Sequence, residues 1–228
     1  MPAPGAGAVI DAAVFDLDGL LIESEEVWDA VRERYVREQG GRYDCEVQRA
    51  MMGMSAPEWS RYLHDVAGVP EEPDAIDAEI VRRLLTEYRR ELPLLAGAVD
   101  AVRRIAARFP LALASSSNRE IIDAVLELGD IADLFEVTVS SEEVARGKPA
   151  PDVYLEAARR LDVEPARCAA VEDSNAGIRS AKAAEMRVIA IPNRTYPPAP
   201  ETLATADAVL GSLDELTPEV VAGEAQTS

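Results

Sequence analysis

Short apolar runs alternate with amphipathic helical stretches beyond residue 94, and this pattern constrains the fold more than any other feature of the chain. Together with an earlier run near the N-terminus, the apolar runs have the length of buried strands. They are VIDAAVF (9–15), LALAS (111–115), VTVSS (137–141), CAAVED (168–173), RVIAIP (187–192) and ADAVLGSL (206–213). Segments between them, such as NREIIDAVLEL and PDVYLEAARRL, repeat apolar residues every three or four positions. The alternation predicts an α/β fold with a doubly wound, Rossmann-like parallel sheet covered by helices on both faces.

Residues 24–94 interrupt this alternation with helical patterns alone. SEEVWDAVRERYV, SAPEWSRYLHDVAG and DAIDAEIVRRLLTEYRREL each place apolar side chains on one helical face. We therefore predict a small helical insert at 24–94 and an α/β core made of 9–23 and 95–217. The short, polar or Pro/Gly-containing ends, 1–8 and 218–228, are predicted to be flexible.

Charge and composition exclude several classes of function. The 228 residues carry a formal net charge of −19, whereas nucleic acids and anionic membranes bind a basic face. No apolar run approaches the ~20 residues that span a bilayer. The two cysteines are too few for a disulfide framework. We expect a cytoplasmic protein with no nucleic acid, membrane or obligate protein partner.

Polar side chains gather where the predicted strands end, which is where ligands bind in folds of this class. These residues are Asp16 and Asp18 after the first strand, Ser115 after the second, Lys148 after the third, and Glu172 and Asp173 after the fourth. Asp16 and Asp18 are close enough to repel unless a cation lies between them or one is protonated. With Asp173 as a third oxygen ligand, Mg²⁺ is the expected cation.

Four motifs of the chain resemble those of haloacid dehalogenase superfamily phosphatases. In chain order they are DLDGLLIES, LALASSSN, GKPAPDVY and VEDSNAGI, and the resemblance extends over about residues 9–216. It is greatest to the branch that contains β-phosphoglucomutase and the sugar-phosphate phosphatases. The resemblance implies that the insert is a cap domain. It also implies a Mg²⁺-dependent phosphomonoester hydrolase that acts on a small phosphorylated metabolite, such as a sugar or polyol phosphate.

The resemblance further implies how the acidic residues act. Asp16 is expected to attack phosphorus and form an aspartyl-phosphate, while Asp18 protonates the leaving alcohol and later deprotonates the attacking water. The expected ligands of Mg²⁺ are the Asp16 carboxylate, the Asp18 backbone carbonyl and Asp173. Glu172 is expected to add a ligand or to orient a metal-bound water.

Other motif residues are expected to bind the substrate. Ser115 and the backbone N–H of Ser116 would hold the phosphoryl oxygens, with Lys148 opposing their charge. Further contacts are expected from Asn118, Asn175 and Glu25, and Glu25 is placed to hydrogen-bond a polyol. Candidate contacts in the insert, for which packing in the insert core is the alternative, are Trp28, Met54 and Trp59.

Two alternative functions stay open. A β-phosphoglucomutase-type mutase is the first, but mutases that resemble this chain carry a histidine at the position of Trp28 and an arginine at that of Ala56. The second is a phospho-acceptor regulatory protein, which also joins an aspartate, Mg²⁺, a hydroxyl group and a lysine. Asp18 and the helical insert argue against it.

Ser117 is predicted to cap the helix that follows it, because Glu120 lies three residues later. Glu185 stands where relatives often have a helix-ending glycine, and this difference should alter a helix end rather than the site.

Overall fold

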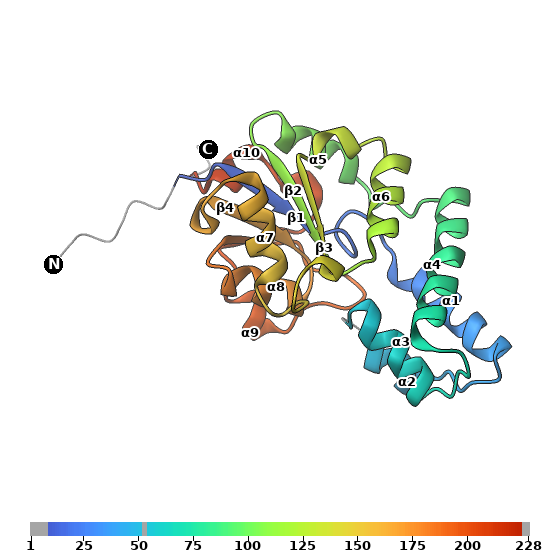
Figure 1. Cartoon of the computed structure of the whole chain (residues 1–228). Coiled ribbons are helices and arrows are strands. Elements are labelled where there is room, and N and C mark those ends of the chain that lie inside the picture. The colour runs from blue at the N-terminus through green and yellow to red at the C-terminus, as the bar shows by residue number, and fades with distance from the viewer. Residues whose placement is uncertain (1–8, 52–53, 225–228) are drawn as a thin grey trace.

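The computed structural model describes residues 9–51 and 54–224, in which six parallel strands form one sheet (Figure 1). Its order is β3-β2-β1-β4-β5-β6. The strands are β1 (Ala12–Phe15), β2 (Leu111–Ser115), β3 (Val137–Ser140), β4 (Cys168–Glu172), β5 (Arg187–Ala190) and β6 (Ala208–Val209). The predicted doubly wound parallel sheet is confirmed.

Helices cover both faces of the sheet because successive strand side chains point in opposite directions. Ala12 and Val14 of β1 pack in one apolar cluster with α7 and α8, whereas Ala13 and Phe15 pack in a second cluster with α5 and α6. The four helices are α5 (Ala98–Ala106), α6 (Arg119–Leu128), α7 (Asp152–Leu161) and α8 (Asn175–Ala183). The smaller helices of the core are α9 (Pro200–Leu203) and α10 (Pro218–Ala222).

The strand register brings the ends of three strands together. β1 lies between β2 and β4, and Phe15 is level with Leu113 on one side and Val171 on the other. All three strands run in the same direction, so the residues that follow them emerge at one edge of the sheet.

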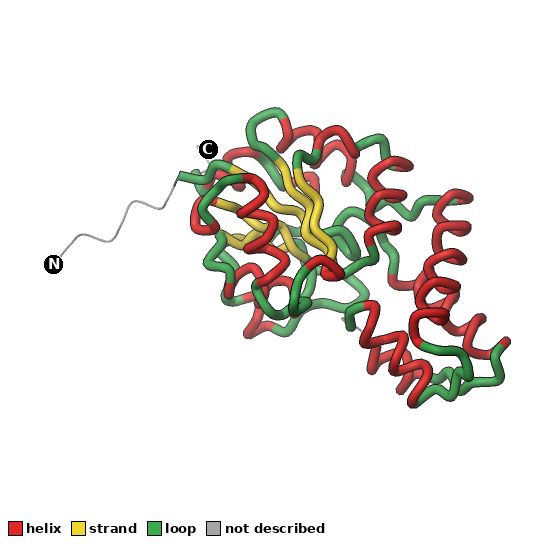
Figure 2. The backbone as a smooth tube through the Cα atoms, in the orientation of Figure 1, coloured by secondary structure: helices red, strands yellow, loops and turns green. Residues whose placement is uncertain are grey.

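The helical insert lies to one side of this edge and contains no strand in its described part (Figure 2). Its helices are α1 (Glu25–Glu38), α2 (Cys45–Met51), α3 (Ala56–Asp65) and α4 (Pro73–Arg90). The two connections to the core run side by side: Ile22 bridges Leu94, and the Glu23 N–H donates to the Pro93 carbonyl over 2.8 Å. We propose that these helices form the cap.

Some local expectations were wrong. The first strand begins at Ala12 rather than at residue 9, and Val9 is exposed. The short helix α2 was missed because only Val47 and Met51 are buried, too few to reveal a period.

The C-terminal end also differs from the prediction. Residues 218–222 form α10 instead of a flexible tail, because Val220 and Val221 are buried and the Thr217 hydroxyl accepts the Val220 N–H over 3.3 Å. The predicted flexible segments 1–8 and 225–228 lie outside the described residues.

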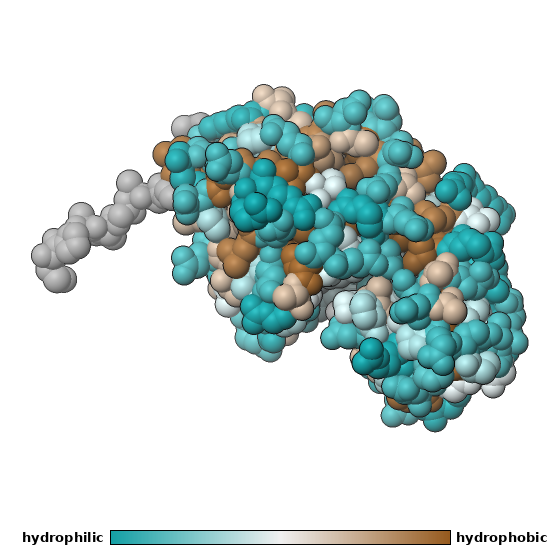
Figure 3. All heavy atoms as spheres, viewed as in Figure 1, coloured by the Kyte–Doolittle hydropathy of each residue, from teal (hydrophilic) through white to brown (hydrophobic). Residues whose placement is uncertain are grey.

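The face of the molecule seen in Figure 3 is mostly hydrophilic, and an indentation lies between the core and the insert. No helix in residues 9–51 and 54–224 is both long and apolar enough to span a bilayer. Cytoplasmic location stays a prediction.

Glu185 adopts the left-handed conformation, with φ of 62°, just after α8. This conformation costs a residue with a side chain ~1 kcal/mol or more, whereas glycine adopts it freely. We expect Glu185→Gly to raise the free energy of unfolding by about 1 kcal/mol and the melting temperature by roughly 2–4 °C. Calorimetry checks this, with Glu185→Ala as the control that keeps the strain. A glycine variant no more stable than the alanine variant would contradict it.

Candidate active site

A buried ammonium group joins carboxylates from two neighbouring strands. Lys148 Nζ lies 2.7 Å from Asp16 Oδ1, after β1, and 2.7 Å from Glu172 Oε1, at the end of β4. Burial, and then the charge of Glu172, raises the pKa of Asp16 to about 7. Burial alone would lower the pKa of Lys148, but the two carboxylates outweigh burial and raise it. The ion pair therefore keeps its proton on the lysine.

Both carboxylate oxygens of Glu172 accept hydrogen bonds. Its two oxygens accept five hydrogen bonds, from Lys148 Nζ, the Tyr154 hydroxyl, the Asp173 N–H, and the N–H and hydroxyl of Ser174. Burial would raise the pKa of Glu172, but Lys148 outweighs burial and holds it below the usual value. With both oxygens occupied, Glu172 anchors Lys148.

Asp173 has a free, buried oxygen. Oδ1 has no hydrogen-bond partner among the described residues, and the side chain packs against Gly19, where a Cβ would lie 2.1 Å from Oδ2. Burial, with the charges of Glu172 and Asp16, raises the pKa of Asp173 well above its usual value. Oxygen atoms of Asp16, Glu172 and Asp173 all lie within 4.8 Å of one another. When all three carboxyl groups are ionised, they exceed the one ammonium by two negative charges, and burial together with this excess raises the pKa of Asp16 and Asp173. The cluster therefore fits a divalent cation.

Asp18 is held by serines from two different segments. Ser24, at the start of the insert, donates to Oδ1 over 2.6 Å, and Ser117, after β2, donates to Oδ2 over 2.7 Å. The prediction that Ser117 caps the helix that follows it was wrong. The N-cap residue of helix α6 is Asn118, and its side chain accepts no hydrogen bond from the first turn of the helix. The Ser117 hydroxyl is directed to Asp18 instead of to the helix.

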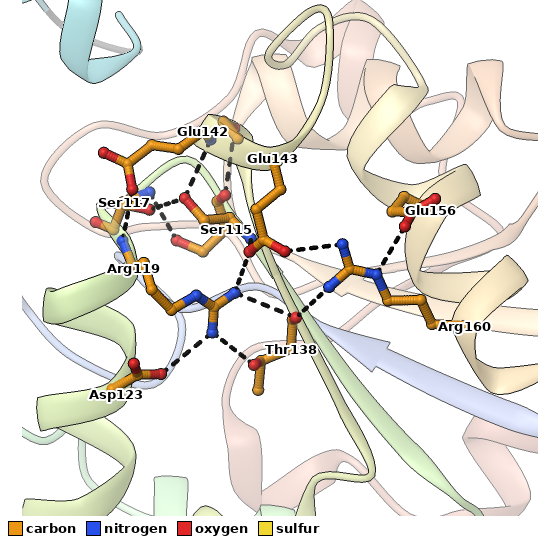
Figure 4. Close-up of polar contacts among 11 residues, drawn as sticks. Ser115, Ser117, Arg119, Asp123, Thr138, Glu142, Glu143, Glu156 and Arg160 are labelled. Atoms are coloured by element: carbon orange, nitrogen blue, oxygen red, sulfur yellow. Dashed lines mark hydrogen bonds and ion pairs between the residues drawn. The ribbon is translucent and has the colours of Figure 1, made fainter.

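The loop after β2 is fixed by the end of β3 (Figure 4). The Ser140 hydroxyl donates to the Ser117 carbonyl over 2.7 Å, and the Ser141 hydroxyl donates to the Ser115 carbonyl over 3.2 Å. The loop that supplies Ser117 to Asp18 therefore depends on its neighbouring strand.

Arg119 ties the start of α6 to β3 in the same view. It donates to the hydroxyl and the carbonyl of Thr138, over 2.6 and 3.2 Å, and pairs with Glu143. Arg160 of α7 also donates to the Thr138 carbonyl and pairs with Glu143. This network joins α6, β3 and α7 below the loop.

Two adjoining cavities open at this edge. The first, which we call the strand-end cavity, is lined among others by Asp16, Lys148, Asp173, Ser174, Asn175 and Asn193. The second, the insert cavity, is lined among others by Trp28, Asp29, Arg32, Tyr43, Trp59 and Asn118. Four residues line both cavities, namely Asp18, Glu25, Ser116 and Tyr196.

The predicted site residues thus lie near one another, but not all of them line one of the two cavities. Ser115 is fully buried and is not among the described residues that line either cavity, whereas Ser116 lines both. The Asn118 amide donates to Asp77 of the insert and to Glu142 of the core. Asn175 lines the strand-end cavity and accepts the Ala199 N–H over 2.9 Å. Burial raises the pKa of Glu25.

Sequence reasoning missed Ser24, Arg32, Tyr43, Asn193 and Tyr196. A signal existed for Arg32, which follows Trp28 by one helical turn, a spacing at which side chains meet. For the loop residues Asn193 and Tyr196 the sequence holds no such signal.

Comparison with known proteins decides the family. A family model described as haloacid dehalogenase-like hydrolase matches residues 10–185. The chain belongs to this family. The resemblance expected from the four motifs is confirmed, and this haloacid dehalogenase-like enzyme has several relatives named as phosphatases.

Three relatives illustrate the similarity of this hydrolase. Hexitol phosphatase B of Escherichia coli (strain K12) is 34% identical over 226 residues, covering 93% of this chain and 96% of the relative. The bifunctional riboflavin kinase/FMN phosphatase of Arabidopsis thaliana is 32% identical over 202 residues. That match covers 88% of this chain but 52% of the relative, so the chain spans about half of its length. The crystal structure of CbbY from Rhodobacter sphaeroides in complex with phosphate superposes with a TM-score of 0.81 at 30% identity, covering 91% of this chain and 96% of that one.

Gly177 makes room for Glu172. A Cβ at this position would lie 1.6 Å from Glu172 Oε1. We expect Gly177→Ala to displace Glu172 and with it Lys148, lowering kcat/KM for phosphate release by ~10²-fold, as a misplaced site group does. Gly147→Ala, beside Lys148, is the matched control, since its Cβ would meet atoms no closer than 3.7 Å. The test is p-nitrophenyl phosphate hydrolysis alongside the melting temperature, and equal rates in the two variants would contradict the role of Gly177.

Proposed function

We propose that the chain is a Mg²⁺-dependent phosphomonoester hydrolase that acts on a small sugar or polyol phosphate through an aspartyl-phosphate on Asp16. One observation carries the proposal. Asp16, Lys148, Asp173 and Asp18 all line the strand-end cavity, so a nucleophile, a fixed cation, a metal-ligating carboxylate and a proton carrier face the same space. Few reactions besides phosphoryl transfer use that combination.

Mg²⁺ fits the donors that are available. The buried, unpartnered Oδ1 of Asp173 and the carboxylate of Asp16 are hard oxygen ligands, and Mg²⁺ takes one or two carboxylates with waters and phosphate oxygens. When bound, the ion neutralises the carboxylates and the substrate phosphate and so lowers their mutual repulsion. The Asp18 carbonyl stays a predicted ligand. Glu172, saturated by hydrogen bonds, acts through Lys148.

The protein residues account for both chemical steps. Ser116 and Lys148 bind the phosphoryl oxygens while Asp16 attacks phosphorus, and the ester P–O bond breaks as Asp18 gives its proton to the leaving oxygen. Asp18 then takes a proton from a water molecule, whose oxygen attacks the aspartyl-phosphate. Inorganic phosphate leaves and the Asp16 carboxylate is restored.

The leaving group would occupy the insert cavity. Its lining includes the expected contacts Glu25, Trp28, Met54 and Trp59. Carboxylate, amide and phenol groups among apolar side chains suit a hydroxylated carbon chain. Relatives named as hexitol phosphatase B and fructose-1-phosphate phosphatase support this substrate class.

The mutase stays the runner-up. Ala56 is buried at the start of α3 and supplies no cation, and Trp28 offers no proton-carrying group. Isomerisation of β-glucose 1-phosphate in the presence of its bisphosphate would favour the mutase. A long-lived phosphoryl-enzyme without turnover would favour the regulatory alternative.

Phosphate release should depend on Asp16 and on the metal. With a panel of hexitol and sugar phosphates, we expect EDTA to abolish release and Mg²⁺ to restore it. Asp16→Asn removes the nucleophile and should lower kcat by roughly 10³-fold or more. The control is Asp133→Asn, an exposed carboxylate far along the chain, which should keep full activity. Turnover persisting in Asp16→Asn would sink the mechanism.

Metal binding should also be visible without any substrate. Mg²⁺ at 100 times its Kd would add ~2.7 kcal/mol of stability, or roughly 5–10 °C in melting temperature. The ligands must be deprotonated and burial raises the pKa of Asp16 to about 7, so the shift should be small at pH 5 and large at pH 8.

The stability of the metal-free protein should change with pH in the opposite direction. A carboxyl group whose pKa is raised in the folded state stabilises the fold at low pH, so stability without metal should fall as pH rises from about 4 to 7. Scanning fluorimetry measures both effects. Asp173→Asn should lose the Mg²⁺ shift and Asp133→Asn should keep it; an equal shift in both variants would exclude Asp173 as a ligand.

A further inference from the structure

The insert cavity contains a guanidinium group held between two indole rings. Arg32 lies on α1 one turn after Trp28, and its guanidinium carbon is 4.4 Å from the Trp28 ring centroid and 4.8 Å from that of Trp59 on α3. The two indoles meet edge to face, with centroids 6.0 Å apart and planes at 67°. Contact with two buried rings from two helices fixes the orientation of the guanidinium.

Arg32 has no carboxylate partner in the part of the chain that the structure describes. Its Nε is buried without a hydrogen bond, and burial lowers the pKa of the guanidinium. By contrast, Arg34 and Arg37 on the same helix pair with Glu87 and Glu33. A desolvated cation with unused donors is costly, which favours a ligand that completes it.

Three carboxylates act on Arg32 through their charge, namely Glu25, Asp18 and Asp29, and none of them bonds to it among the described residues. Asp29 accepts the Tyr43 hydroxyl over 2.7 Å, and Asp18 accepts Ser24 and Ser117. The N–H groups of the Arg32 guanidinium are therefore available to a ligand in the insert cavity.

Each of the two adjoining cavities has one cation among its described lining residues. Lys148 lines the strand-end cavity and Arg32 lines the insert cavity, while the residues common to both include Asp18 and Glu25. Each cation attracts an anion at its own end, whereas the shared carboxylates Asp18 and Glu25 oppose an anion in the middle and can accept hydrogen bonds from hydroxyl groups. Asp29 also lines the insert cavity, and its Oδ1 accepts the Tyr43 hydroxyl.

We propose that Arg32 is a specificity-determining residue that binds an oxyanion, either a carboxylate or a second phosphate, at the end of the leaving group remote from the reacting ester. The proposal rests on the proposed phosphatase function and narrows its substrate class to hydroxylated chains with an acidic group at each end. A planar guanidinium binds both oxyanions through two parallel hydrogen bonds.

A matched pair of substrates tests the carboxylate form. 6-Phosphogluconate and sorbitol 6-phosphate differ only at C1, which is a carboxylate in the first and a hydroxymethyl group in the second. We expect the wild-type enzyme to prefer 6-phosphogluconate in kcat/KM by ~10- to 100-fold, the value of a charge-assisted hydrogen bond. Arg32→Gln should bring the ratio of the two values close to one, while Arg34→Gln should leave the ratio unchanged.

A purely structural role gives a different result. If Arg32 only packs against the indoles, Arg32→Gln would lower kcat/KM for both substrates equally and lower the melting temperature. Arg32→Lys, which keeps the charge but not the planar fork, should retain only part of the preference. An unchanged ratio, or a parallel loss on both substrates, would overturn the carboxylate form of the proposal and leave only the phosphate form to be tested by binding.

Binding separates this proposal from the proposed function. In Asp16→Asn, calorimetric titration compares 6-phosphogluconate with sorbitol 6-phosphate, and fructose 1,6-bisphosphate with fructose 1-phosphate. Tighter binding of the doubly acidic member, lost in Asp16→Asn/Arg32→Gln, upholds the role of Arg32 even if the wild-type enzyme hydrolyses neither compound. In that case the two proposals are separated, because the phosphatase proposal is decided by phosphate release from the panel of hexitol and sugar phosphates. A preference confined to the bisphosphate identifies phosphate as the oxyanion, and equal affinities within both pairs would refute the Arg32 site.

Discussion

The bridge from Lys148 to Asp16 and Glu172 is the interaction on which the rest of the site depends. Two buried carboxylates from adjacent strands would repel strongly in a medium of low dielectric constant. The ammonium group, brought by the loop after β3, makes their proximity tolerable. Since Glu172 also accepts the first N–H groups of the turn into α8, the same ion pair positions Asp173. The ammonium group of Lys148 thus joins the ends of β1, β3 and β4.

The second organising feature is the way that Asp18 contacts both parts of the molecule. Ser24 belongs to the segment that enters the insert, and Ser117 belongs to a loop fixed by β3. The side chain that we assign to proton transfer is therefore oriented by groups outside its own loop. Asp16, the proposed nucleophile, is in contrast positioned within the core alone.

Much of this arrangement is predictable from the sequence, and the reason is geometric. Parallel strands place their carboxyl ends at one edge, so the strand pattern alone groups residues as distant in sequence as Asp16, Lys148 and Asp173. The partner of Ser117 could not be predicted in this way, because helix capping and a bond to Asp18 are both open to a serine at that position. Arg32 was missed since its significance arises from Trp59, on another helix, and from the absence of a bonded acid among the described residues. Helix α10 depends on the burial of Val220 and Val221, which a short terminal segment does not reveal.

The paired connections at Ile22 and Leu94 have an evolutionary consequence. Because the chain leaves and re-enters the core at adjacent points, the residues between them form an excursion that the sheet does not need for its own connectivity. A loop of another length, or an unrelated small domain, can be grafted at this junction without changing strand order or register. On the proposed function, the range of leaving groups can therefore diversify by exchange of one module that keeps a donor to Asp18 in the place of Ser24, while Asp16, Lys148 and Asp173 in the core are inherited unchanged.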